Sequence, residues 1–496
     1  MLSLQRLIDI ALAVIRVKVS AVFLEPTGVG IVSQVGGFQN LMSQFVNLGV
    51  GGGVTKYVAE YTSKQESRSL EKLLQTVVSG FAITGIIAFL ISLIFAPQFA
   101  DLALADHSLG LLIVLAGIAV PLTAQTQIVS RCLQGMLKIR EMVLLGMVSS
   151  VLGLVITVPL IILANVTGAV LSMGLSALFS LAIGQLYLQR VALREYHVRL
   201  HFAVPDKEMS IKLLRFGGAN SVMVISDILT LLAIRSTIIA RFGAASNGLY
   251  QVVFGLSNQY LALITAALWT YGMPKVATML DDPAGIDKVR NDVLRLSLSI
   301  FTPLIVLILV FRGVWIPILY SQSFIGASSL LGWQVIGDIF RAIFGPANIS
   351  NAPKERFGFI IGQTLLFSML QLGTFWLLLP LVGLRAAPMS YALARGVMTP
   401  IVLFAHYRYD RFVYSSKNWL LVVKSIPVLG VTLILTSLPN VNPVLNYLVP
   451  SVALVAWALT VVSHKEVQTA VRIGHDYVAR FQTAVEVVTK RRKKEI

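Results

Sequence analysis

Two apolar helices carry the residues best able to do chemistry. Each holds one aspartate and, about two turns later, one arginine: Asp9 and Arg16 in the first, Asp227 and Arg235 in the second. A charge at the centre of a bilayer costs roughly 2.5–3.5 kcal/mol on insertion scales, so it usually faces a water-filled cavity or an opposite charge. Two interpretations stay open: a cavity for a charged ligand, or buried Asp–Arg pairs that only fix helix packing. The repeated placement favours a cavity lined from both sides.

Other basic residues inside apolar segments add to this charge. They are Lys18, Arg341 and Arg395, which with Arg16 and Arg235 place up to five cations on four helices with few acids. Such a surplus favours an anionic ligand, and arginine binds phosphate oxygens in a two-pronged geometry that lysine lacks. A pyrophosphate is the natural candidate. Snorkelling to the membrane interface is the competing explanation, strongest for Lys18, Arg241 and Arg312.

The acids Asp9, Asp227 and Asp338 have two possible roles. Asp338 lies one helical turn before Arg341 and can pair with it. All three carboxylates could couple transport to an ion by titrating if burial raised their pKa values. They could equally be neutralised by neighbouring arginines.

Amide side chains gather on the second helix of each half. Gln44 and Asn47 share one helical face, as do Gln251, Asn258 and Thr265 in the second half. Amides can hydrogen-bond sugar hydroxyls, or they can bond a neighbouring helix, which is common in membranes. We predict that Gln44, Asn47 and Asn258 line the cavity.

Composition places the chain in a membrane. Its 496 residues are 56% hydrophobic and only 13% charged, with a net charge of +17. Soluble domains usually carry about 25% charged residues. The basic residues lie in short loops, where they set topology and meet anionic lipid, so nucleic acid is not an expected partner. Cys132 is the single cysteine, and no metal-ligand or nucleotide motif is present, so we predict no enzyme, no metal and no cofactor.

Apolar stretches of membrane-spanning length predict an all-α polytopic protein with about fourteen transmembrane helices. The predicted segments are Leu4–Leu24, Ile31–Val54, Leu73–Phe95, Leu109–Val129, Val143–Ala164, Val170–Leu188, Leu213–Ala240, Leu249–Tyr271, Leu294–Tyr320, Ser328–Phe344, Phe357–Leu379, Ala386–Ala405, Trp419–Leu438 and Val444–Val462. Alternate loops are rich in lysine and arginine. The positive-inside rule therefore predicts that both termini are cytoplasmic.

An internal repeat divides the chain into two halves. Gly28 to Tyr57 aligns without gaps with Gly248 to Ala277, and Lys138 and Arg140 match Lys354 and Arg356. Six helices separate the copies, so the halves keep one orientation, as in parallel-repeat transporters.

Four regions follow from this repeat. We predict an N-terminal six-helix bundle at 1–196, a C-terminal six-helix bundle at 208–407, two additional transmembrane helices at 418–463 and a basic tail at 464–496. The tail is interpreted as an amphipathic helix on the cytoplasmic leaflet or as a solvated extension.

Four stretches resemble one family: Pro26 to Gly30, Gly53 to Tyr61, Gln259 to Ala266, and Trp333 to Asp338 with Arg356-Phe357. The chain is similar from Met1 to about Tyr407 to bacterial lipid-linked oligosaccharide flippases. These O-antigen and lipid III translocases form the polysaccharide branch of the multidrug/oligosaccharidyl-lipid/polysaccharide exporter superfamily. The resemblance implies two six-helix bundles around a cationic cavity that alternates between membrane faces, in the inner membrane. The last two helices exceed the twelve-helix form.

The resemblance implies a flippase that moves undecaprenyl-pyrophosphate-linked oligosaccharide from the cytoplasmic to the periplasmic leaflet. It implies a role in making O-antigen, lipopolysaccharide or enterobacterial common antigen, with polysaccharide polymerase and chain-length proteins as possible partners beside membrane lipid. A drug/cation antiporter on the same fold would favour acidic cavity residues. A polytopic glycosyltransferase or polymerase would need a large external loop with catalytic residues, and a membrane scaffold would not need mid-membrane charges.

Overall fold

The computed structural model describes residues 2–198, 202–437 and 443–461, all of which lie in helices or the turns between them. The predicted basic tail at 464–496 lies outside these residues. The first half consists of α1 (Leu2–Asn47), α2 (Gly51–Ser63), α3 (Ser67–Ile94), α4 (Ala96–Leu104), α5 (Gly110–Gly135) and α6 (Ile139–Tyr187). A π-helical turn at Leu188–Ala192 and a 3₁₀ turn at Arg194–Tyr196 follow.

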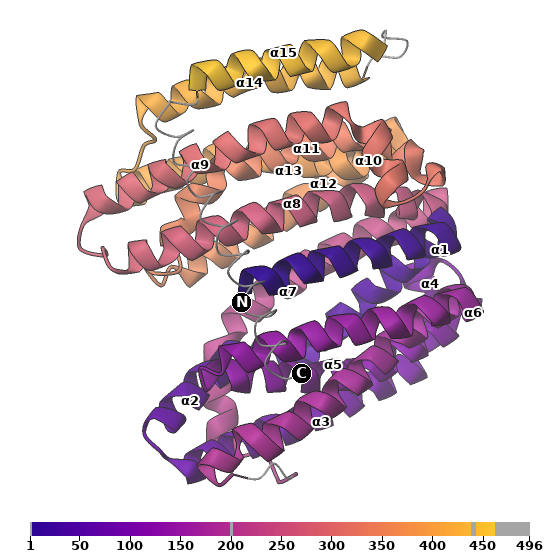
Figure 1. Cartoon of the computed structure of the whole chain (residues 1–496), viewed down its shortest axis with the longest axis vertical. Helices are drawn as coiled ribbons and strands as arrows, with labels where there is room; N and C mark the ends of the chain where they lie inside the picture. The colour runs from indigo at the N-terminus through magenta and orange to yellow at the C-terminus, as the bar shows by residue number, and fades with distance from the viewer. Residues whose placement is uncertain (1, 199–201, 438–442, 462–496) are drawn as a thin grey trace, which may run out of the picture.

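The second half starts with α7 (Lys207–Phe242), α8 (Ala244–Ala277), α9 (Pro283–Val310) and α10 (Arg312–Leu319). It continues with α11 (Ser328–Phe344), α12 (Phe357–Val382) and α13 (Ala386–Asp410), and 3₁₀ turns at Gln322–Ala327, Gly345–Ser350 and Gly383–Arg385 join some of these helices. Two further helices, α14 (Ser416–Ser437) and α15 (Pro443–Val461), form an outer layer beside α9 (Figure 1).

Two of the long helices contain a sharp bend. In α1 the bend is at Glu25, with a φ of 55°, just before Pro26, and in α6 it is at Asn165, with a φ of 47°. A left-handed residue reverses the chain direction, and proline cannot donate the helical hydrogen bond. Each bend therefore separates two predicted spans.

Eight helical stretches of the described chain are long and apolar enough to cross a membrane. Two of these, Ile139–Tyr196 and Phe357–Asp410, each contain two predicted spans. The predicted fold class, an all-α polytopic membrane protein, is confirmed. The division at 196 and 208 into bundles stays a prediction.

Two predicted spans are interrupted. The span Ile31–Val54 breaks between Asn47 and Gly51, where Leu48 and Gly49 have positive φ. The span Leu294–Tyr320 breaks at Phe311, where α9 ends and α10 begins. Hydropathy cannot detect such breaks because the residues at both remain mostly apolar.

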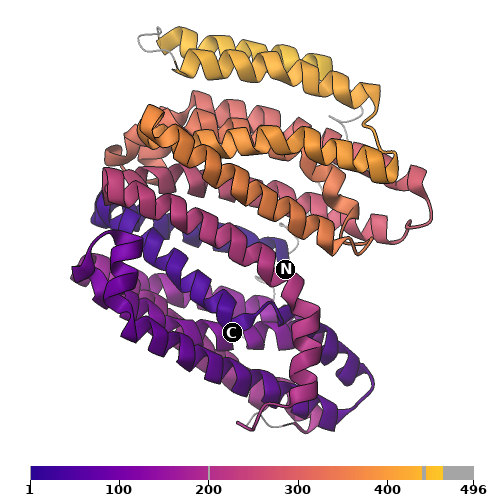
Figure 2. The ribbon, with the colours of Figure 1, turned by 180° about the vertical axis from the view of Figure 1, so that it is seen from behind.

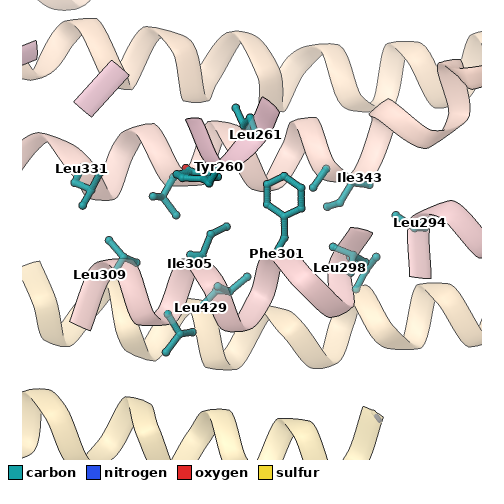
Figure 3. Packing of buried hydrophobic residues seen from close by; sticks show 14 of the residues in the cluster. Tyr260, Leu261, Leu294, Leu298, Phe301, Ile305, Leu309, Leu331, Ile343 and Leu429 are labelled. Atoms are coloured by element: carbon teal, nitrogen blue, oxygen red, sulfur yellow. The ribbon is translucent and has the colours of Figure 1, made fainter. Parts of the chain in front are cut away.

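The largest apolar core joins the second half to the outer helices. Phe301, Ile305 and Leu309 of α9 pack in one cluster with Leu331 of α11 and Leu429 of α14 (Figure 3). Trp457 of α15 belongs to the same cluster and donates a hydrogen bond to Ser425 of α14 at 3.1 Å. The two outer helices are thus an integral layer of the C-terminal half.

Helix α7 contacts both halves of the chain (Figure 2). Its first turns pack Met209 and Leu213 into the core formed by α2, α3 and α5, while its later turns contact α12. Asp206 caps its N-terminus by accepting a hydrogen bond from the Met209 amide at 2.9 Å. The hydrogen bond from Lys72 holds the pKa of Asp206 below its usual value, so this cap stays charged.

The two halves meet along a seam that the second part of α1 forms with α7 and α8. Near one end a Cβ added to Gly30 would lie 1.9 Å from the Ala244 carbonyl oxygen, and one added to Gly248 would lie 2.0 Å from the Pro26 carbonyl oxygen. Near the other end a Cβ on Gly49 would lie 2.4 Å from the Gly217 carbonyl oxygen. Backbone therefore packs directly on backbone at both ends of the seam.

We expect Gly248→Ala to destabilise the protein by about 1–3 kcal/mol, because the added methyl group overpacks a contact made by backbone atoms. The measurement is thermal unfolding in detergent. Gly362→Ala is the control, since a Cβ there meets no atom within 4 Å. Equal stability of the two variants would contradict the seam.

The predicted orientation is tested by single cysteines in a Cys132→Ala background, because Cys132 is fully buried. We expect Ser108→Cys and Ser323→Cys to react with an impermeant thiol reagent added outside intact cells, and Ser416→Cys to resist it. All three serines are exposed. The reverse labelling pattern would invert the topology.

Candidate functional site: polar cavities in both halves

The first half encloses a cavity of about 780 Å³ between α1, α5 and α6. Arg16 and Arg131 supply its positive charge, and no carboxylate is among its described lining residues. The remaining polar walls are amides and hydroxyls: Ser20, Gln39, Asn40, Thr123, Thr126, Gln127, Ser130, Gln134, Thr157, Ser172, Ser176 and Ser180. This cavity suits an anion that also carries hydroxyl groups.

Arg16 lines this cavity, and part of its hydrogen-bonding capacity is unused. One guanidinium nitrogen packs against Gly153, where an added Cβ would come within 2.7 Å of it. Its buried Nε has no hydrogen-bond partner among the described residues. A buried donor left without a partner costs free energy, so a ligand acceptor here would be stabilised. The sequence analysis placed Arg16 in a cavity but missed Arg131, whose loop-end position looked like a topology signal.

The second half contains two cavities of about 320 Å³ each, and both are lined by Asp227, Arg341, Phe367 and Arg395. Asn258 lines one of them, as predicted. The Arg395 guanidinium lies 3.6 Å from the Phe367 ring centroid, with Phe344 and Tyr391 also within cation–π distance. Phe344 and Tyr391 were not singled out from the sequence because aromatic residues are ordinary in apolar helices.

Asp338 is fully buried beside these cavities. It accepts hydrogen bonds from Ser257 at 2.7 Å, from Tyr391 at 2.9 Å and from Tyr260. Among the ion pairs of the described residues none joins it to Arg341, so the predicted pairing is replaced by three hydroxyl donors. Those donors come from α8 and α13, which sequence spacing along α11 could not reveal.

Arg235 lies in the seam, not on a cavity wall. It is 4% exposed, donates to the Ser33 carbonyl oxygen at 3.2 Å and also bonds the Gln251 side chain. Extended back without a gap, the repeat alignment pairs Arg235 with Ile15, one residue before Arg16. One residue is about 100° around a helix. The two arginines therefore face different surroundings, and this placement favours packing for Arg235.

The remaining predicted residues divide between cavities and contacts. Lys18 donates to the Pro317 carbonyl oxygen at 2.8 Å, and Asp9 accepts from Ser150 at 2.7 Å beside a separate apolar cavity. Asn47 is buried and donates to Gln127, a residue of the first cavity, at 2.9 Å. Gln44 is half-buried on α1 and is absent from the described linings of these cavities. Lys18, Gln44 and Asn47 thus lie outside the cavity walls in this conformation.

One ion cluster was missed because its members are far apart in sequence. Asp410 accepts from Arg290 at 2.6 Å, Arg356 at 2.7 Å and Lys354 at 3.1 Å. His406 links this cluster to Asn348 at 3.0 Å, and Asn348 lines a cavity of the second half. Unlike the cavity arginines, these cations share a carboxylate.

The repeat explains part of that cluster. Lys138 and Lys354 occupy equivalent loops in the two halves, and each pairs with an acid at or after the end of a later helix. Lys138 bonds Glu195 at 2.7 Å, as Lys354 bonds Asp410. The hydrogen bond from Lys138 to Glu195 raises the pKa of Lys138 above its usual value. These lysines close the ends of the bundles and do not line the cavities.

Known proteins resemble this chain in sequence and fold. Residues 1–269 match the family described as polysaccharide biosynthesis protein. The lipid III flippases of Escherichia coli strain K12 and Shigella flexneri are each 23% identical over 383 residues, 75% of this chain and 89% of the relative. These matches confirm the resemblance seen in the sequence.

Solved structures share the fold. The lipid II flippase MurJ in an inward closed conformation superposes with a TM-score of 0.68 over 92% of this chain and 97% of its own, at 13% identity. An inward-facing multidrug resistance transporter of the MATE family gives a TM-score of 0.64 over 83% of this chain and 95% of its own, at 16% identity.

The seam placement of Arg235 predicts a stability effect. We expect Arg235→Ala to lower the free energy of unfolding by about 2–4 kcal/mol, because it leaves buried acceptors on Ser33 and Gln251 without their donor. Thermal unfolding of purified protein measures this. Arg241→Ala, on an exposed arginine of the same helix, is the control. Unchanged stability of Arg235→Ala would return this arginine to the ligand-binding candidates.

Proposed function

Because this chain belongs to the polysaccharide biosynthesis protein family, we propose that it is a flippase for lipid-linked oligosaccharide. The proposed substrate is an undecaprenyl-pyrophosphate-linked oligosaccharide. It moves from the cytoplasmic to the periplasmic leaflet of the inner membrane. The names of the lipid III and lipid II flippases that the chain resembles support this substrate class.

The observation that carries the proposal is the charge of the first cavity. Arg16 and Arg131 line a cavity of about 780 Å³ whose described walls hold no carboxylate, so a bound anion would balance their charge. A pyrophosphate offers several oxygens to a planar guanidinium. The surrounding amides and hydroxyls suit the sugars that follow it.

The second half contributes a smaller and more balanced site. Arg341 and Arg395 share its walls with Asp227, so the net charge there is lower. We infer that the pyrophosphate binds first near Arg16 and that the C-terminal cavities join the site as the halves move. Alternating access then consists of motion of the two halves about the seam.

A drug/cation antiporter on the same fold is the second candidate, because the second half has an aromatic box suited to a cation. The Arg395 guanidinium already covers the rings of Phe344, Phe367 and Tyr391. A drug cation would have to displace this side chain and would meet a second arginine, Arg341, in the same cavity. The observation therefore favours the anionic substrate.

Reconstituted vesicles test the function directly. Purified protein in proteoliposomes should move a fluorescent pyrophosphate-linked glycolipid between leaflets with no added glycosyl donor. A sugar-free cationic dye serves as the antiporter substrate. Movement of the dye without movement of the glycolipid would reject the flippase.

Arg16 is the residue whose replacement should affect transport most. We expect Arg16→Ala to slow glycolipid movement about tenfold or more, because charge-assisted bonds of about 1.5–3 kcal/mol are lost. Arg16→Lys keeps the charge but not the planar fork, so it should recover part of the rate. The measurement is the initial rate at matched amounts of folded protein.

Arg140→Ala is the matched control, since Arg140 is exposed at the start of α6 and outside the cavity lining. A wild-type rate for Arg16→Ala would contradict the cationic site. Equal rates for Arg16→Lys and Arg16→Ala would assign Arg16 to packing.

A further inference from the structure

A further polar cavity lies apart from the cavity of the first half and the two cavities of the second half. It measures about 410 Å³ and is formed where α9 ends, α11 begins and α14 packs against them. Arg312 and Arg385 supply its charge, and no acid is among its described lining residues. Ser328, Ser329 and Trp333 of α11 and Thr436 of α14 complete the polar part of the wall.

Arg312 is held in place by neutral groups. It donates to the Leu309 carbonyl oxygen at 2.9 Å and to the Thr436 carbonyl oxygen, at the ends of α9 and α14. Carbonyl oxygens orient a guanidinium but leave its full charge unbalanced. The side chain is therefore fixed at the cavity with its positive charge available to an anion.

Arg385 is exposed at the turn before α13. Within the described residues no hydrogen bond or ion pair engages its guanidinium, and it lines the same cavity as Arg312. Arg312 and Arg385 lie at the edges of loops that hold almost no other basic residue. Their convergence on one cavity is not explained by topology, which favours few basic residues at this end.

The surroundings indicate a ligand that is partly in lipid. Ile434 of α14 is 61% exposed next to the cavity, and Trp333 is 36% exposed. Tryptophan is enriched where the apolar membrane meets water. This end of the bundle is the one at which α9 and α14 end, opposite the Asp410 cluster at the end of α13.

We propose that this cavity binds the phosphate group of a membrane lipid between Arg312 and Arg385, with the lipid chain along the exposed face of α14. The outer pair α14 and α15 then has a function of its own: α14 supplies one wall of a lipid phosphate site. The site is separate from the cavities lined by Arg16 and by Arg395, so it does not rest on the proposed flippase activity.

Binding to purified protein in a neutral detergent tests the proposal. The probes are phosphatidylglycerol and undecaprenyl phosphate, compared with diacylglycerol of matched chains and with water-soluble glycerol phosphate. We expect the two lipid phosphates to bind at least tenfold more tightly than either comparator. The tighter of the two identifies the source of the phosphate as bulk phospholipid or polyprenyl carrier.

Variants locate the site. Arg385→Gln should weaken lipid phosphate binding roughly threefold, as expected for an exposed charged contact, and Arg312→Gln with Arg385→Gln roughly thirtyfold. Arg241→Gln is the control, an exposed arginine at the same end outside this cavity. Arg385→Gln breaks no hydrogen bond within the described residues, so it still tests the site if Arg312→Gln fails to fold.

Three results would overturn the proposal. Diacylglycerol binding as tightly as phosphatidylglycerol would show an apolar groove without phosphate recognition. Glycerol phosphate binding as tightly as the lipids would show that the lipid chain contributes nothing and that the site does not recognise a membrane lipid. Unchanged binding in Arg385→Gln, or an equal loss in Arg241→Gln, would place the phosphate elsewhere.

Discussion

The contact of backbone on backbone along the seam is the constraint on which the rest of the structure depends. Gly30 and Gly248 bring α1 against the start of α8, and Gly49 and Gly217 bring α1 against α7. With no side chains between them at these points, the helices cannot separate without exposing backbone groups and losing close packing. Polar side chains are buried in the seam and form hydrogen bonds across it. Gln34, which is fully buried, donates to the Leu232 carbonyl oxygen and to Ser236. Asn247 donates to the Gly30 carbonyl oxygen. Under the proposed alternating access, we expect the halves to rotate about this line or to separate at one end of it.

The arginines of the first and seventh predicted spans, Arg16 and Arg235, differ in their relation to the seam. Arg235 donates to acceptors inside the contact, whereas Arg16 stays at a cavity wall. Burial without a carboxylate is tolerable for Arg235 because a backbone carbonyl oxygen and an amide oxygen accept hydrogen bonds from its guanidinium. The Phe254 ring also lies against its face. The same residue type at nearly matching positions thus packs inside the seam in one half and lines a cavity in the other.

The fold could be predicted from the sequence because it depends on apolar length, loop charge and the repeat, each of which is visible in the order of residues without knowledge of contacts between helices. The bends at Glu25 and Asn165 fell between predicted spans for the same reason. The site was predicted only in part. Arg16, Arg341, Arg395, Asp227 and Asn258 line cavities. Arg235 faces the seam because one residue of helical register changes the face that a side chain occupies. Asp338 bonds three hydroxyls from two other helices, which spacing along its own helix does not encode. Arg131 and the cluster at Asp410 depend on contacts between distant helices, which no spacing within one helix encodes.

The cavity of the first half and the cavities of the second half differ in how strongly their walls attract an anion. In the first half the cations have no lining carboxylate, while in the second half Asp227 faces the same cavities as Arg341 and Arg395, and Arg395 is held by three aromatic rings. An anion therefore gains more from the first cavity than from the second, since in the second it competes with Asp227 for the same cations. A carrier must release what it binds, and equal, strong attraction from both halves would trap a pyrophosphate. Under the proposed alternating access, a strong site facing a weaker one of the same sign would allow capture by one half and release once the halves rotate and Asp227 approaches the bound anion, because like charges repel more strongly as water is excluded.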